Sequence, residues 1–303
     1  MSGAVATVGA GLPRPSYAVL RTLARAELRR SLRSPVLPLG AVAAVWYLWT
    51  ITPAAEQWSG SAYQEMAISS GPLLGAVSWT VARSFHRERT GVATAAPVRE
   101  GARAVARFVA ALPLVALTAG FAGLVAWRQR DLGGLTLGTE PGRTAEALHS
   151  LPELVQPLAL GMLAVALGAV LGRRMPRLAL ALPVLLVFWF AVTGLYWLFG
   201  SRSIAPFSVV QVQPITVPAG SASADPMGFP SRWLLEAPGD YQAGWARLFV
   251  SADLAWWHCG WLLGISALLL AAAVPAGSSR RGLLAVGAAV AVVCACAQTV
   301  VIP

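Results

Sequence analysis

The 303-residue chain is 56% hydrophobic and only 12% charged, and its net charge is +10. Because a soluble domain carries about 25% charged residues, this composition excludes an ordinary soluble fold and predicts a polytopic membrane protein. All 23 basic residues are arginine, so the chain lacks the lysine that a P-loop nucleotide site or Schiff-base catalysis requires. The arginines flank apolar runs, which favours membrane topology over nucleic-acid binding. The three cysteines lie within apolar runs and form neither a disulfide framework nor a zinc motif.

Residues 1–34 are predicted to form a cytoplasmic N-terminus with an amphipathic helix at 14–33. One side of this helix is apolar, with leucines at Leu20, Leu23, Leu28 and Leu32. Arginines that suit contact with lipid phosphates decorate the rest, at Arg21, Arg25, Arg29 and Arg30. We therefore predict an interfacial helix, with a solvated basic leader as the alternative.

Long apolar runs predict an all-α fold, a polytopic transmembrane helical bundle with six core spans plus a seventh. Residues 35–276 form the predicted core, with spans at about 36–55, 66–82, 108–127, 154–171, 178–200 and 254–276. Residues 277–303 add a short basic loop and a last span at 283–302. The second run is short and diluted by serine and threonine, and the last run lies beyond the six core spans, so six spans with a terminal anchor describe the chain equally well. In the large loop 201–253, we expect an extended segment at Phe207–Val217 and a short amphipathic helix at Tyr241–Val250.

The distribution of charge predicts the orientation of the bundle. With the N-terminus inside the cell, 17 of the 23 arginines lie on the cytoplasmic side and ten of the 13 acidic residues lie outside. The cytoplasmic side of a membrane protein carries the excess of arginine. We therefore predict a multi-pass protein of the cell membrane, in a bacterial inner membrane, with a cytoplasmic N-terminus.

The predicted spans carry little reactive chemistry. No Asp, Glu or Arg lies in the core of any span, whereas an ion-coupled pump or an intramembrane enzyme needs ionisable groups there. His258 and Cys259 are adjacent on a helix and point about 100° apart, so they do not predict a metal site, and we predict no catalytic residue. Small-residue pairs indicate close helix packing or a dimer seam, at Gly71/Gly75, Gly168/Gly172 and Gly260/Gly264.

The cytoplasmic loop 83–107 contains a more specific pattern. Between Ser84 and Arg99, an Arg-Glu-Arg run leads to a glycine, a short apolar stretch and a Pro-Val pair. This pattern resembles the coupling segment of type 2 ABC transporter permeases, the membrane-spanning subunits of ABC exporters. The helix before the first span and the large outer loop are similar to that family's layout as well. Two features depart from it, because the stretch from Gly91 to Pro97 is shorter by nearly a turn and the seventh span is additional.

The resemblance implies the permease subunit of an ATP-driven exporter, which is not itself an enzyme. Its partners would be a separate ABC ATPase that holds ATP and Mg, a second permease subunit in a homo- or heterodimer, and membrane lipid. The substrate would be amphipathic or lipid-like, since the spans offer apolar and aromatic surface. The implied coupling residues are Arg87, Glu88, Arg89, Thr90, Gly91, Pro97 and Arg99. Two alternatives remain: a basic loop that only fixes topology, and a non-transporting membrane component such as an assembly, immunity or sensor protein.

Overall fold

The fold is mostly helical in a computed structural model that describes residues 17–53, 60–90, 98, 100–138, 144–195, 201–210, 213–239 and 242–303. The helices in the first half are α1 (Tyr17–Leu32), α2 (Val36–Thr50), α3 (Ser61–Ile68), α4 (Gly71–Thr90) and α5 (Glu100–Asp131). Those in the second half are α6 (Leu151–Arg174), α7 (Ala181–Gly194), α8 (Ala252–Ala273) and α9 (Ser278–Val301).

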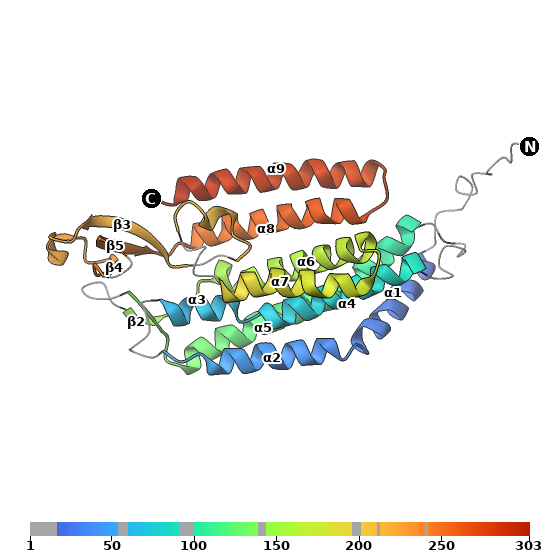
Figure 1. Cartoon of the computed structure of the whole chain (residues 1–303), viewed down its shortest axis with the longest axis horizontal. Helices are drawn as coiled ribbons and strands as arrows, with labels where there is room; N and C mark the ends of the chain where they lie inside the picture. Colours follow the sequence, from blue (N-terminus) through green and yellow to red (C-terminus); the bar gives the residue numbers. More distant parts are fainter. Residues whose placement is uncertain are drawn as a thin grey trace, which may run out of the picture.

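The long helices run side by side and form an elongated bundle with two different ends (Figure 1). One end of the bundle contains α1, the C-terminal ends of α4, α6 and α8 and the starts of α5 and α9; we call this the basic end. At the other end, the strands project beyond the helices, and we call it the sheet end. Helices α8 and α9 form an antiparallel pair along one side of the bundle.

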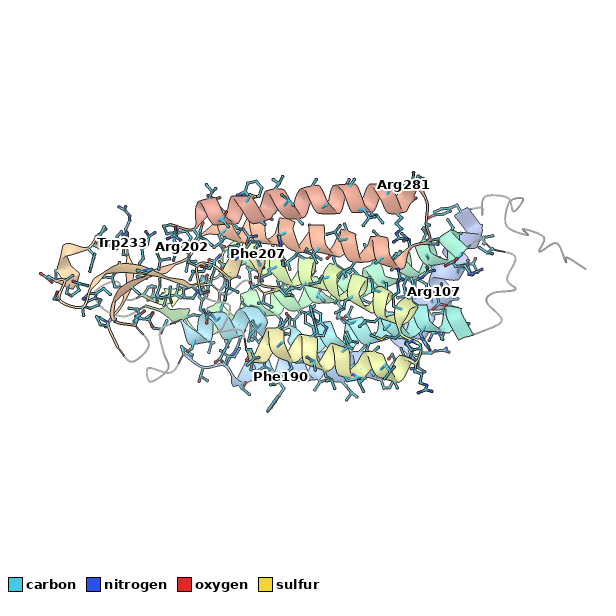
Figure 2. All side chains as sticks on the ribbon, turned by 45° about the horizontal axis from the view of Figure 1, so that its top comes forward. Arg107, Phe190, Arg202, Phe207, Trp233 and Arg281 are labelled. Atoms are coloured by element: carbon cyan, nitrogen blue, oxygen red, sulfur yellow. The ribbon has the colours of Figure 1, made fainter. Side chains whose placement is uncertain are left out.

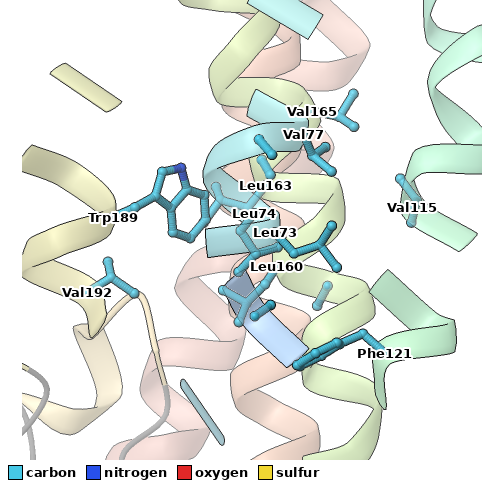
Figure 3. Packing of buried hydrophobic residues seen from close by; sticks show 14 of the residues in the cluster. Leu73, Leu74, Val77, Val115, Phe121, Leu160, Leu163, Val165, Trp189 and Val192 are labelled. Atoms are coloured by element: carbon cyan, nitrogen blue, oxygen red, sulfur yellow. The ribbon is translucent and has the colours of Figure 1, made fainter. Parts of the chain in front are cut away.

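Helix α4 occupies the centre of the bundle and packs against α2, α5, α6 and α7. Its Leu73, Leu74 and Val77 side chains are buried, and Leu160 of α6 lies in the same cluster (Figure 3). Trp189 of α7 also enters this cluster, and its indole N–H donates a hydrogen bond of 3.1 Å to the Ser78 hydroxyl. Because protein surrounds α4, its side chains Ser78, Thr80 and Ser84 are buried against neighbouring helices rather than lipid.

Four described helices are long and apolar enough to cross a membrane: α5, α6, α8 and α9. The outermost, α9, exposes a series of valine side chains, at Val286, Val292, Val293 and Val300. Apolar side chains on the outside of a bundle suit contact with lipid rather than water. The chain is therefore a multi-pass membrane protein.

The prediction of six core spans plus a seventh is wrong by length and composition within the described residues. Helices α2 and α7 are apolar but only 15 and 14 residues long, so each covers about 22 Å of a hydrocarbon core about 30 Å thick. The predicted second span, 66–82, is divided between the short α3 and α4. Helix α4 carries charged residues in its second half, among them Arg83 and Arg87.

The all-α prediction is also corrected, because both loops at the sheet end contain strands. Strands β1 (Leu135–Leu137) and β2 (Thr144–Ala147) form an antiparallel pair. In the larger loop, β3 (Ile215–Ser221), β5 (Gly244–Phe249) and β4 (Leu234–Glu236) form an antiparallel sheet with β5 in the middle. In this sheet Ile215 pairs with Phe249 and Leu234 pairs with Leu248.

The helix predicted at Tyr241–Val250 is therefore strand β5 over most of its length. Its buried residues are Ala246 and Leu248, two positions apart, which is the periodicity of a strand with one covered face. The prediction of an extended segment at Phe207–Val217 is confirmed only in part. A 3-10 helix occupies Ala205–Phe207 and β3 begins at Ile215.

Candidate functional site

The candidate coupling site lies at the basic end, where α1 meets the end of α4. The Glu27 carboxylate of α1 accepts hydrogen bonds from the Ser84 hydroxyl and the Arg87 guanidinium of α4, both at 3.0 Å. Its other oxygen accepts from Arg30 at 3.1 Å. The Glu27 side chain is only 12% exposed, and donors surround it, as a largely buried carboxylate requires. One acidic side chain therefore joins the first helix to the central helix.

Helix α1 also packs against the first half of α5. Ala24 is buried together with Ala106 and Ala110, and leucines of α1 surround them, at Leu20, Leu23 and Leu28. The fourth leucine of the predicted apolar side, Leu32, is 60% exposed. The predicted interfacial arginines all lie on the exposed surface of α1, at Arg21, Arg25, Arg29 and Arg30. The helix thus presents a cationic face outward while its apolar side covers α5.

The structure places only part of the predicted coupling segment. Arg87 lies in the last turns of α4 and contacts Glu27, and the backbone of Glu88, Arg89 and Thr90 continues the same helix. Gly91, Pro97 and Arg99 lie outside the described residues. Helix α5 then begins at Glu100, so the segment connects the central helix to the helix that supports α1.

All three predicted glycine pairs face neighbouring helices. A Cβ atom at Gly71 would meet Thr193 of α7, and one at Gly75 would contact Trp189 at 3.6 Å. Cβ atoms at Gly168 and Gly172 of α6 would meet carbonyl oxygens of α4. Within the α8–α9 pair, a Cβ atom at Gly260 would lie 2.6 Å from Cys294 Sγ, and one at Gly264 would lie 2.6 Å from the Ala291 nitrogen. These pairs therefore lie at contacts inside one bundle.

A buried polar cluster at the sheet end was not anticipated from the sequence. Glu153, in the first turn of α6, accepts hydrogen bonds from the Tyr63 hydroxyl at 2.9 Å and from the Ser150 backbone N–H at 2.8 Å. His149 stacks on the Tyr63 ring, with the ring centroids 3.9 Å apart. Its Nδ1 atom lies 2.9 Å from Gln129 Oε1. The cluster fixes α3, α5 and α6 to one another.

Burial controls the protonation of this cluster. Desolvation, and then the charge of Glu153, raise the pKa of the Tyr63 hydroxyl, so that it remains a hydrogen-bond donor. Desolvation lowers the pKa of His149 below 6.5, and the opposing effect of Glu153 is smaller. A neutral His149 has one nitrogen that can donate and one that can accept. The cluster is therefore built around one carboxylate and a neutral imidazole.

His258 of α8 and Gln298 of α9 meet in the structure. His258 Nδ1 lies 2.9 Å from Gln298 Oε1, and the Gln298 amide donates to the Pro206 carbonyl oxygen at 3.1 Å. These bonds join α8 and α9 to the loop that precedes β3. Among the residues that the structure describes, no three His, Cys, Asp or Glu side chains are grouped to hold a metal ion.

Comparison of the chain with protein-family models, curated proteins and solved structures finds no match. Two features distinguish the ends of the bundle. The basic end has an exposed arginine-rich helix bound to the central helix, and the sheet end has a buried, hydrogen-bonded cluster around Glu153. The first offers a charged contact surface, and the second stabilises the fold.

Proposed function

We propose that the chain is the membrane-spanning permease subunit of an ATP-driven ABC exporter. A separate ATPase subunit would hold ATP and Mg and dock at the cytoplasmic face, which in this proposal is the basic end. The substrate would be amphipathic or lipid-like, because the described membrane-spanning helices present mainly apolar surface. A second permease subunit, identical or related, would complete the transport path.

The observation that carries this proposal is the Glu27 junction between α1 and α4. A partner that moves the segment after Thr90 acts directly on α4, which is the central helix of the bundle. The Glu27–Arg87 ion pair transmits the same displacement to α1. Movement at one small contact would therefore reach α2, α5, α6 and α7 through the packing of α4. This is the mechanical connection that a permease without its own energy source needs.

Co-purification from the native host tests the proposal. Tagged wild-type chain, extracted in a mild detergent, should recover a P-loop ATPase in a stoichiometric amount. Glu88→Arg should abolish this recovery by reversing the charge in the proposed contact. Glu146→Arg makes the same change on an exposed residue at the opposite end and should leave recovery unchanged. Recovery of no ATPase with the wild-type chain would contradict the proposal and favour a non-transporting membrane component.

A further inference from the structure

A cavity of about 480 Å³ opens at the basic end, between the ends of α4, α6 and α8 and the starts of α5 and α9. We call it the arginine pocket. It lies close to the start of α9, where Figure 2 labels Arg281. Phe85 and the turn between α8 and α9 form an apolar wall that includes Val274, Pro275 and Ala276.

The charge of the arginine pocket is strongly positive. Its described lining contains four arginines and a single acidic residue: Arg103, Arg173, Arg174, Arg280 and Glu100. The guanidinium of Arg173 pairs with Glu100 at 2.5 Å, and Arg174 and Arg280 contribute two further positive charges to the same lining. Like charges gathered around a cavity destabilise one another unless an anion enters. Planar guanidinium groups suit phosphate because they donate paired hydrogen bonds to its oxygens.

Helix α9 adds a second reason to expect an anion in this place. Its first turn contains two arginines and no acidic residue, and no side chain caps its N-terminus. The N-terminus of a helix carries partial positive charge, so Arg280 and Arg281 are unfavourable there in the absence of a counter-charge. An anion in the arginine pocket would neutralise both Arg280 and the end of the helix.

The position of the pocket indicates where such an anion comes from. It lies where the apolar helices α6, α8 and α9 begin or end, which is the level of the lipid headgroups around a membrane protein. Leu284 and Val286, one to two turns further along α9, are exposed apolar residues on the membrane-facing part of the helix. An acyl chain can lie along this surface while its headgroup occupies the pocket.

We propose that the arginine pocket is a binding site for a phosphate group at the membrane surface. The phosphate reaches it on the headgroup of an anionic phospholipid or as a soluble ion from the aqueous side. Glu100 regulates this site, because it competes with the phosphate for Arg173. Its side chain is 52% exposed, whereas that of Arg173 is 16% exposed, so the carboxylate can turn away into water when a ligand enters. The site does not depend on the transport function proposed above.

Lipid retention in nanodiscs tests this proposal. The full chain is reconstituted in phosphatidylcholine that contains a small fraction of phosphatidylglycerol, and bound phosphatidylglycerol is counted by native mass spectrometry. Loss of a charge-assisted hydrogen bond reduces affinity about tenfold. Arg280→Gln should therefore reduce phosphatidylglycerol affinity about tenfold. The matched control Arg281→Gln removes an equal charge from the next residue, which does not line the pocket, and should change affinity less than about twofold.

A gain-of-affinity variant keeps the test valid if the arginine variants fold poorly. Glu100→Gln removes the negative charge that competes with the ligand for Arg173 and should raise phosphatidylglycerol affinity several-fold. Titration of the detergent-solubilised chain with inorganic phosphate, followed by thermal unfolding, separates the two sources of phosphate. Protection by phosphatidylglycerol alone identifies a lipid site, and equal protection by inorganic phosphate identifies a site for the soluble ion. Equal losses in the Arg280 and Arg281 variants, or no gain with Glu100→Gln, would overturn the proposal.

Discussion

Replacement of Glu153 by alanine should destabilise the sheet end of the bundle severely. The carboxylate accepts from the Tyr63 hydroxyl at 2.9 Å and from the Ser150 backbone and hydroxyl at 2.8 and 2.6 Å. Hydrogen bonds to a charged group contribute about 1.5–3 kcal/mol each, and a buried hydroxyl without a partner costs about 1–3 kcal/mol. The bond from the Ser150 backbone N–H is also the Glu153 half of the capping box at the start of α6. Removing the carboxylate also removes the cost of burying its charge. We therefore expect a net loss of about 3–4 kcal/mol.

Unfolding in detergent, followed by tryptophan fluorescence, measures this loss as a change in the free energy of unfolding. Glu153→Gln preserves the size of the side chain and one oxygen acceptor, so it should cost about half as much as alanine. Glu146→Ala, at an exposed position of β2, should change the free energy by less than about 0.5 kcal/mol. If Glu153→Ala fell within that same limit, the assignment of the cluster as the stabilising element of the sheet end would be refuted.

Three further results are expected. The pKa of His149 is lower in the folded protein than the unfolded value of 6.5. The free energy of unfolding should therefore keep its full value above pH 6.5 and decrease as the pH falls below it, by at most about 1.4 kcal/mol per pH unit. A free energy of unfolding that stays constant from pH 7 to pH 5 would contradict this. Glu27→Gln removes the negative charge that pairs with Arg87 and one of the two carboxylate acceptors. Hydrogen exchange in α1 should therefore accelerate about fivefold for a loss of about 1 kcal/mol, and unchanged exchange would exclude the junction as a restraint. Gly168→Ala forces α6 away from α4 and should lower the free energy of unfolding by about 1–3 kcal/mol. The control is Gly120→Ala, because the added Cβ atom meets nothing within 4 Å there. This control should be neutral or slightly stabilising in thermal unfolding.

The sequence alone predicts those helices whose apolar composition is enough to place them in a membrane. The apolar runs at 108–127, 154–171, 254–276 and 283–302 correspond closely to α5, α6, α8 and α9. Each is long and apolar enough to enter a membrane without help from a particular neighbour. The length of each apolar run and the arginines at its ends are visible within a short stretch of sequence, so one sequence is enough to find these helices.

Features that depend on neighbours could not be predicted in this way. Helix α4 carries serine and threonine because other helices enclose it, and that enclosure is a property of the complete fold. Strand β5 is stabilised by pairing with β3 and β4, which are separate segments of the same loop. The cluster of Tyr63, Gln129, His149 and Glu153 joins residues up to 90 positions apart. The only local signal for it was Ser150 three residues before Glu153, which is the spacing of a capping box.

The arginine pocket shows a similar limit for the candidate sites. Arg103, Arg173 and Arg280 were all counted as topology signals in the sequence, because each flanks an apolar run. Their convergence around one cavity follows from the way α5, α6 and the α8–α9 turn meet at the basic end. The sequence thus predicts which helix ends are charged. Only the tertiary structure shows that these arginines surround one cavity.

The most direct test of the proposed permease function is site-specific photo-cross-linking in living cells of the native host. A photoreactive amino acid is placed at position 88, at the end of α4, and in a matched strain at position 146 in β2. The proposal predicts an adduct with a P-loop ATPase from position 88 and none from position 146. Absence of an ATPase adduct from position 88, with the chain inserted and intact, would contradict it.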